Sequence, residues 1–127
     1  MIIGQVSKAE DNKLYPETQY FGRNRCDVFK RLWPDGETER LPLEPSLKLA
    51  DHSPTGFSWG RSGSGSAQLA LALLLDATTL PDTALDYYQE FKEEYVAIWG
   101  AEWIIFRGDI INWLRLRHGE NIKTEKN

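Results

Sequence analysis

The side chains best suited to chemistry in this sequence lie in one loop that is rich in glycine and serine and leads into an apolar helix. At a helix N-terminus the first backbone N–H groups lack intrahelical partners, and the helix dipole favours an anion. An arginine and several hydroxyls in the loop would add charge and hydrogen bonds. The candidate ligand- or partner-binding residues are therefore His52, Ser53, Thr55, Trp59, Arg61, Ser62, Gly63, Ser64, Gly65 and Ser66.

Three interpretations of this loop remain open. In the first it is a tight connection that caps the helix, because glycine permits backbone angles that other residues avoid. In the second it binds an anionic small molecule or nucleotide, and in the third it binds a protein partner. The loop is not a P-loop, since no Gly-Lys-Ser/Thr ending follows, and no clear strand precedes it as a dinucleotide-binding unit requires.

No group of residues in the sequence predicts catalysis or metal binding. His52 lies in a rigid turn, and we expect it to brace that turn; an enzyme with His52 as general base is the third functional hypothesis and lacks supporting residues. The run Gly63–Ala67 lacks the final glycine of a nucleophile elbow. The two histidines and the carboxylates do not have the spacing of a metal site, so we expect no metal and no cofactor.

Charge and composition limit the class of partner. A net charge of −4 argues against general nucleic-acid binding, which normally requires a basic surface. Five Trp, five Tyr and five Phe are a high aromatic load, which we expect to form an aromatic core with a few surface rings; the alternative is that the excess contributes to an interface or a ligand site. The single Cys26 excludes an internal disulfide, and we expect it to be a buried or inert thiol. With no signal peptide or membrane span in the sequence, we expect a cytoplasmic protein that binds no membrane.

We expect one domain over residues 19–119, preceded by an N-terminal extension or edge strand over residues 1–18 and followed by a flexible tail over residues 120–127. Residues 19–43 have the composition of β-structure. Within them, Pro34-Asp35-Gly36 predicts a hairpin in which the glycine takes a left-handed angle. Residues 46–49 are expected to be extended or turn-like.

Three helices are expected after the loop. The first, residues 66–77, is apolar on nearly all sides and should be central in the core. The second, residues 83–99, is amphipathic and is expected to be capped by Asp82 or Thr83. A strand over residues 102–107 and a helix from Gly108-Asp109 to Gly119 follow. The predicted fold class is therefore α+β, with a small, mainly antiparallel sheet packed against about three helices.

The stretch from His52 to Asp76 resembles a family of small uncharacterised prokaryotic proteins, a domain of unknown function found in bacteria and in phage or plasmid genes. The family pattern is His-Ser-Pro-Thr-Gly-Phe, then Trp-Gly-Tyr, then Gly-Ser-Gly-Pro-Ala-Gln and an Ala/Leu helix. The resemblance covers about residues 19–117 and includes a Tyr-Gln-x-Phe-Lys segment. The matching residues are His52–Phe57, Trp59-Gly60, Gly63–Gly65, Ala67-Gln68 and Tyr87–Lys92.

Two departures from the family pattern bear on the loop. Arg61 stands where the family has tyrosine, which favours an anion contact or an interface at this position. Ser66 stands where the family has proline, a residue suited to the first helical position. The resemblance therefore implies that Ser66 is the first helical residue and that Ser64 or Gly65 is the cap.

We expect a non-enzymatic interaction protein. The resemblance implies a gene carried by a phage or mobile element, and the expected partner is a host component such as a defence protein. The alternative function is the binding of a small anionic ligand or nucleotide by the glycine-rich loop. The sequence does not predict an oligomeric state.

Overall fold

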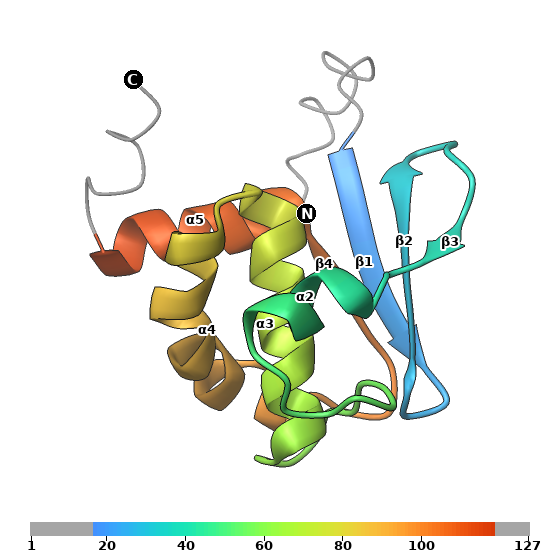
Figure 1. Ribbon diagram of the computed structural model, residues 1–127. Helices are drawn as coiled ribbons and strands as arrows, with labels where there is room; N and C mark the ends of the chain where they lie inside the picture. Colours follow the sequence, from blue (N-terminus) through green and yellow to red (C-terminus); the bar gives the residue numbers. More distant parts are fainter. Residues whose placement is uncertain (1–16, 119–127) are drawn as a thin grey trace.

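A computed structural model describes residues 17–118 as a four-stranded antiparallel sheet with helices on one side (Figure 1). This arrangement confirms the predicted α+β class. The predicted N-terminal extension or edge strand, up to residue 16, and the predicted tail at residues 120–127 lie outside the described residues. Residues 17 and 18, which we assigned to that extension, belong to the first strand of the sheet. None of the helices within residues 17–118 combines the length and apolar character needed to cross a bilayer.

The sheet has the strand order β3-β2-β1-β4. Its strands are β1 (Glu17–Arg23), β2 (Asp27–Trp33), β3 (Glu39–Arg40) and β4 (Trp103–Phe106). Strands β1 and β2 form a hairpin that the sequence did not signal, because its turn uses Asn24 and Arg25 at positive φ angles of 54° and 66° instead of glycine. Local side-chain hydrogen bonding lets asparagine adopt this conformation at low cost.

The predicted hairpin at Pro34-Asp35-Gly36 is present, but two of its details were wrong. Strand β3 is only two residues long, although the sequence suggested a second arm that continued to Leu43. Gly36 has no positive φ angle; its N–H donates to the carbonyl of Leu32 at 2.6 Å. This hydrogen bond between residues four positions apart closes the turn without the left-handed residue that we expected.

Four α-helices are present among the described residues, one more than expected. They are α2 (Glu44–Leu49), α3 (Ser64–Thr78), α4 (Pro81–Glu94) and α5 (Arg107–His118), and a 3₁₀ turn, η1 (Val96–Ile98), follows α4. The extra helix α2 contradicts the extended segment predicted at residues 46–49. Pro45 fits the first turn of α2, and the Ser46 hydroxyl donates to the carbonyl of Leu43 at 2.9 Å.

The helix ends also correct the sequence predictions. Helix α3 begins at Ser64 with Gly63 as its N-cap, so neither Ser64 nor Gly65 is the cap, and Ser66 is not the first helical residue. Helix α4 begins at Pro81, ahead of the predicted caps Asp82 and Thr83, because proline lacks the N–H that the first turn leaves unpaired. It ends at Glu94 instead of continuing to residue 99, since the chain turns to bury Val96 in η1.

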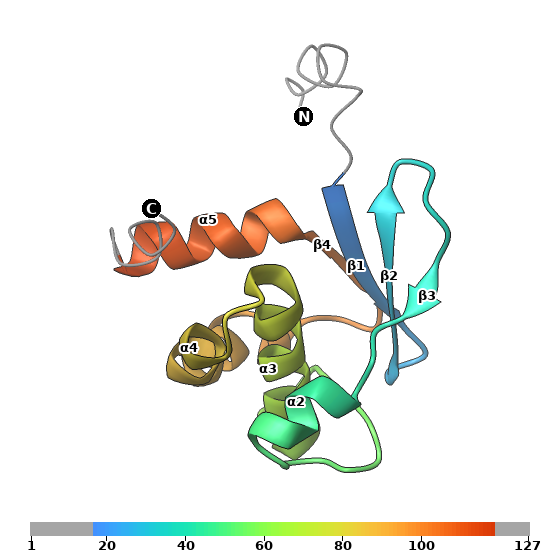
Figure 2. The same cartoon turned by 45° about the horizontal axis from the view of Figure 1, so that its top comes forward.

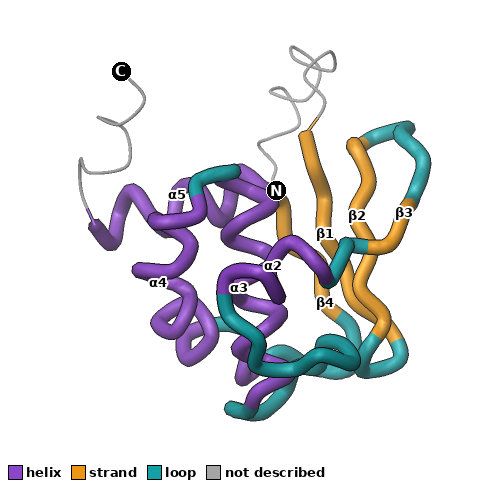
Figure 3. Tube along the Cα trace, in the orientation of Figure 1, coloured by secondary structure: helices purple, strands orange, loops and turns teal. Residues whose placement is uncertain are grey.

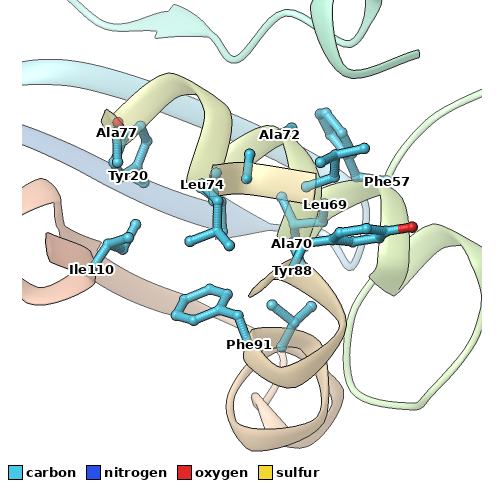
Figure 4. Close-up of a cluster of buried hydrophobic side chains, with 14 of the residues drawn as sticks. Tyr20, Phe57, Leu69, Ala70, Ala72, Leu74, Ala77, Tyr88, Phe91 and Ile110 are labelled. Atoms are coloured by element: carbon cyan, nitrogen blue, oxygen red, sulfur yellow. The ribbon is translucent and has the colours of Figure 1, made fainter. Parts of the chain in front are cut away.

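Helix α3 lies at the centre of the core, as its apolar sequence predicted. Figure 4 shows Leu69, Ala70 and Leu74 of α3 in one cluster with Tyr20 of the sheet and with Tyr88 and Phe91 of α4. Burial of this helix on all sides removes a large apolar area from water, which is the main stabilising contribution to the fold. The fully buried side chains of α3 include Leu69, Leu71, Leu73 and Leu74.

A polar contact fixes α3 against the sheet. The carboxylate of Asp76, in the last turn of α3, accepts a hydrogen bond from the Tyr20 hydroxyl at 2.7 Å. Its other oxygen pairs with the ammonium of Lys30 at 2.7 Å. Tyr20 lies on β1 and Lys30 on β2, so one carboxylate connects the central helix to both central strands.

Candidate functional site

The loop between α2 and α3 runs from the helices to the lower end of the sheet and back (Figure 3). Its start is fastened by Gln68, a fully buried side chain of α3. The Gln68 carbonyl oxygen Oε1 accepts hydrogen bonds from the backbone N–H groups of His52 at 2.7 Å and Ser53 at 2.9 Å. Its Nε2 donates to the Ser46 hydroxyl at 2.9 Å and to the Ala50 carbonyl at 3.0 Å. One amide thus holds both α2 and the loop on the central helix.

His52 braces the loop through its imidazole. Its Nε2 lies 2.7 Å from the Tyr88 hydroxyl of α4, and the two rings are 5.6 Å apart between centroids. The hydroxyl of the next residue, Ser53, donates to the carbonyl of Gly56 at 2.7 Å and closes a local turn. These contacts give His52 the bracing role that the sequence favoured over that of a general base.

Two of the candidate residues belong to the core. Trp59 is 6% exposed, its indole N–H donates to the Gly100 carbonyl at 2.8 Å, and its ring packs edge-on against Trp103. Ser66 is fully buried, and its hydroxyl donates to the Arg61 carbonyl at 2.5 Å. Substitution of Trp59 would therefore test stability and not contact with a partner.

Ser62 is exposed and connects the loop to α4. Its hydroxyl donates to the Glu93 carboxylate at 3.0 Å. This hydrogen bond, with a smaller contribution from Lys92, holds the pKa of Glu93 below its usual range. The contact lies at the surface and adds a second attachment of the loop to α4.

The remaining candidate residues line one groove. It has a volume of about 740 Å³ and lies between the loop, the β1–β2 turn and the segment that leads into α2. His52, Trp59, Ser62 and Ser66 do not line it. The candidates that do are Ser53, Thr55, Arg61, Gly63, Ser64 and Gly65.

The charge of the groove comes from two arginines with different surroundings. Arg40 pairs with Asp27 at 3.2 Å. A hydrogen bond from Asn24, followed by the one from Arg40, holds the pKa of Asp27 below its usual range. Arg61 is exposed and forms no ion pair with any residue in the part of the chain that the structure describes. The guanidinium of Arg61 is therefore the group most available to a negatively charged ligand or partner.

The first turn of α3 lies in the wall of the same groove. Gly63, Ser64 and Gly65 line it, and no described side chain caps the N-terminus of this helix. Gly65 must be small, because a Cβ there would lie 2.2 Å from the Ser58 hydroxyl oxygen. The turn therefore presents backbone N–H groups beside Arg61, which is the arrangement expected for an anion-binding alternative.

Sequence reasoning missed Gln68 and one wall of the groove. Gln68 had a usable signal: it is a polar residue within an otherwise apolar helix, and a buried polar group must find hydrogen-bond partners. The missed wall had no local signal in the sequence, because residues of the sheet and of the segment after it come beside the loop only when the chain folds. It consists of Cys26, Asp27, Val28, Arg40, Leu41, Pro42 and Leu43.

Two smaller observations complete the chemistry of the described residues. Cys26 is exposed, so of the two expected alternatives, a buried or an inert thiol, the buried one is wrong; its sulfur lies 3.9 Å from an Asp27 carboxylate oxygen. Among residues 17–118, no three His, Cys, Asp or Glu side chains are placed to hold a metal ion.

The fold and the groove define a small α+β domain with a braced surface loop. The model of the Family of unknown function (DUF6166) matches residues 20–116, and the chain belongs to this family. A search of curated proteins and a search of solved structures found no match to the chain.

Proposed function

We propose that this chain is a non-enzymatic interaction protein that binds a protein partner in the groove beside residues 52–66. One observation carries the proposal: the loop is anchored from within, while its exposed side chains line the groove. Gln68 and Tyr88 hold its start, and Thr55 and Arg61 are exposed on the groove side. A surface fixed before binding loses less conformational entropy when the partner docks.

The chemistry of the groove agrees with a protein partner. One wall carries the apolar residues Leu41 and Pro42, and the opposite wall carries Arg61 and Ser64. Protein interfaces combine an apolar centre with a polar rim, and arginine is enriched among the residues that contribute most to binding. The unpaired guanidinium favours a partner surface that presents a carboxylate.

The setting proposed for this interaction follows from the family resemblance. The gene is carried by a phage or another mobile element, and the partner is a host component such as a defence protein. The protein acts in the cytoplasm, where thiols stay reduced; one exposed free cysteine agrees with such a compartment.

A charge reversal with a bulky substitution in the groove tests the proposal. Arg61→Glu combined with Thr55→Arg should reduce capture of the partner from host lysate at least tenfold, which corresponds to about 1.4 kcal/mol. Both residues are exposed, so the fold should be unaffected. Arg115→Glu, an exposed position on α5 outside the groove, is the control for the charge reversal at position 61. Full capture by the groove variant would refute the assignment of the site.

The second candidate function is the binding of a small anionic ligand or nucleotide in the same groove. It is favoured by the uncapped first turn of α3 beside Arg61. Native mass spectrometry should then show a dissociable extra mass, and a phosphate-bearing compound should raise the melting temperature. Arg61→Ala should abolish that rise. An unchanged melting temperature across a broad nucleotide panel would exclude this function.

A further inference from the structure

Helix α3 has two cavities along one side. One is the groove beside residues 52–66, which Gly65 lines; the other has a volume of about 340 Å³ and is lined by Ala72 and Asp76. Ala72 lies seven residues after Gly65 and Asp76 eleven, which is about two and three turns of a helix. All three positions therefore share one face of α3, and the two cavities lie on the same side of it. We call the second one the α2–α3 cavity.

Helix α2 and the segment before it separate the two cavities. Figures 1 and 2 show α2 lying against α3, where the Gln68 amide holds it through Ser46 and Ala50. Gln68 comes between the residues of α3 that line the groove and those that line the α2–α3 cavity. Leu41 and Pro42, in the segment that leads into α2, line both cavities. Pro42 is exposed, so a single partner that crosses this common wall contacts both.

The α2–α3 cavity suits an apolar side chain. Beside the two shared residues its walls include Pro45, Ala72 and Leu75. The polar side chains that line it already have partners. The Asp76 carboxylate accepts the Tyr20 hydroxyl, and the Ser46 hydroxyl donates to a backbone carbonyl. An apolar group would therefore enter without leaving a polar group of the wall unpaired.

Charge distinguishes the two cavities. In the groove, Arg40 pairs with Asp27, whereas Arg61 forms no ion pair within residues 17–118. In the α2–α3 cavity, Asp76 pairs with Lys30 at 2.7 Å. The side chains that line the groove thus keep one uncompensated positive charge, and those that line the α2–α3 cavity keep none. A complementary partner presents a carboxylate to the first and an apolar side chain to the second.

We propose that the partner is an extended peptide segment with two anchors, a carboxylate paired with Arg61 and a large apolar side chain in the α2–α3 cavity. This inference rests on the proposed function and specifies the chemistry of the partner. An extended segment follows the wall at Pro42 from one cavity to the other, which a straight helix about 10 Å wide cannot do.

The geometry of α3 predicts the spacing of the two anchors. The distance from Ser64 in the groove to Leu75 in the α2–α3 cavity is about 17 Å along the helix axis, at about 1.5 Å per residue. An extended chain covers this distance in about five residues. Side chains that point to the same side of an extended chain are an even number of residues apart, so the anchors should be about four or six positions apart.

The test selects ligands from a phage-displayed library of random peptides of about twelve residues, which is long enough for both anchors. The selected peptides should share an acidic and a large apolar residue at the predicted spacing. Fluorescence anisotropy then measures the affinity of one labelled peptide. Thr79→Arg, at an exposed position of the α2–α3 cavity, should weaken binding about tenfold. Ala72→Leu, which fills this cavity from its floor, should have the same effect. Thr38→Arg is the matched control: it is exposed, lines neither cavity and should leave the affinity unchanged.

Paired changes in peptide and protein separate the two anchors. Alanine in place of the apolar peptide residue should weaken binding to the wild type about tenfold and have little further effect on Thr79→Arg. An amide in place of the peptide carboxylate should likewise have little further effect on Arg61→Gln.

The outcomes distinguish this inference from the proposed function. Coupling of the carboxylate to Arg61 without coupling of the apolar residue to Thr79 would overturn the two-anchor inference and leave the groove as the binding surface. Absence of both couplings would count against both. A library that yields no binder, or only binders without the predicted spacing, would overturn the two-anchor inference alone, because crosslinking from position 55 tests the groove separately.

Discussion

Replacement of Gln68 by leucine should lower the free energy of unfolding by about 3–5 kcal/mol, a large fraction of the total for a domain of this size. The substitution removes four hydrogen bonds from one buried amide. It leaves the N–H groups of His52 and Ser53 and the carbonyl of Ala50 without partners, and each such group costs about 1–3 kcal/mol when it stays buried. Urea denaturation followed by fluorescence measures the change.

The matched control for this prediction is Gln89→Leu, the same substitution at an exposed position of α4. It should change the free energy of unfolding by no more than about 0.5 kcal/mol. Gln68→Glu is a second comparison, because it keeps the acceptor for His52 and Ser53 but loses the donor to Ala50. A decrease below about 1 kcal/mol in Gln68→Leu would contradict the idea that this amide anchors the loop.

The second large effect concerns stability at alkaline pH. Burial raises the pKa of Tyr20 well above its usual range, and the neighbouring Asp76 carboxylate raises it further. The folded protein therefore keeps this proton where the unfolded chain loses it. The contribution of Tyr20 is fully present below its unfolded pKa of about 10 and falls as the pH rises above that value, by about 1.4 kcal/mol per pH unit.

Tyr20→Phe isolates this contribution, because the other tyrosines and lysines titrate in both proteins. At pH 8 the wild type should be more stable by about 1.5–3 kcal/mol, the usual contribution of a hydrogen bond to a charged group. The difference should shrink as the pH rises above about 10, with the slope given above. Urea denaturation curves from neutral to alkaline pH measure it. A constant difference across this range would mean that Tyr20 titrates normally in the folded state.

The parts of the fold that the sequence predicted are those encoded locally. The apolar run of α3 indicates a central helix on its own, and Pro34-Asp35-Gly36 indicates a chain reversal between β2 and β3. Helix α2 escaped prediction because six residues are too few to show helical periodicity. Its stability depends on Gln68, which lies on another helix.

The candidate site was predicted only in part, because only its locally encoded residues could be recognised in the sequence. The loop could be recognised from its glycines and serines, but the sequence does not separate its anchoring residues from its exposed ones. Trp59 and Ser66 proved to be buried, and their polar hydrogens are donated to the carbonyls of Gly100 and Arg61. The far wall of the groove comes from the sheet and includes Arg40 of the β2–β3 hairpin. The turn signal indicates this hairpin, but no local pattern indicates that it lies beside the loop.

The most direct test of the proposed interaction places a photoreactive amino acid at position 55, on the wall of the groove. A matched protein carries it at position 115 on α5, which is exposed but outside the groove. After irradiation in host cells, we expect one covalent partner from position 55 that Arg61→Glu removes, and none from position 115. Equal crosslinking from both positions, or no partner from position 55, would contradict the proposal that the groove is the binding surface.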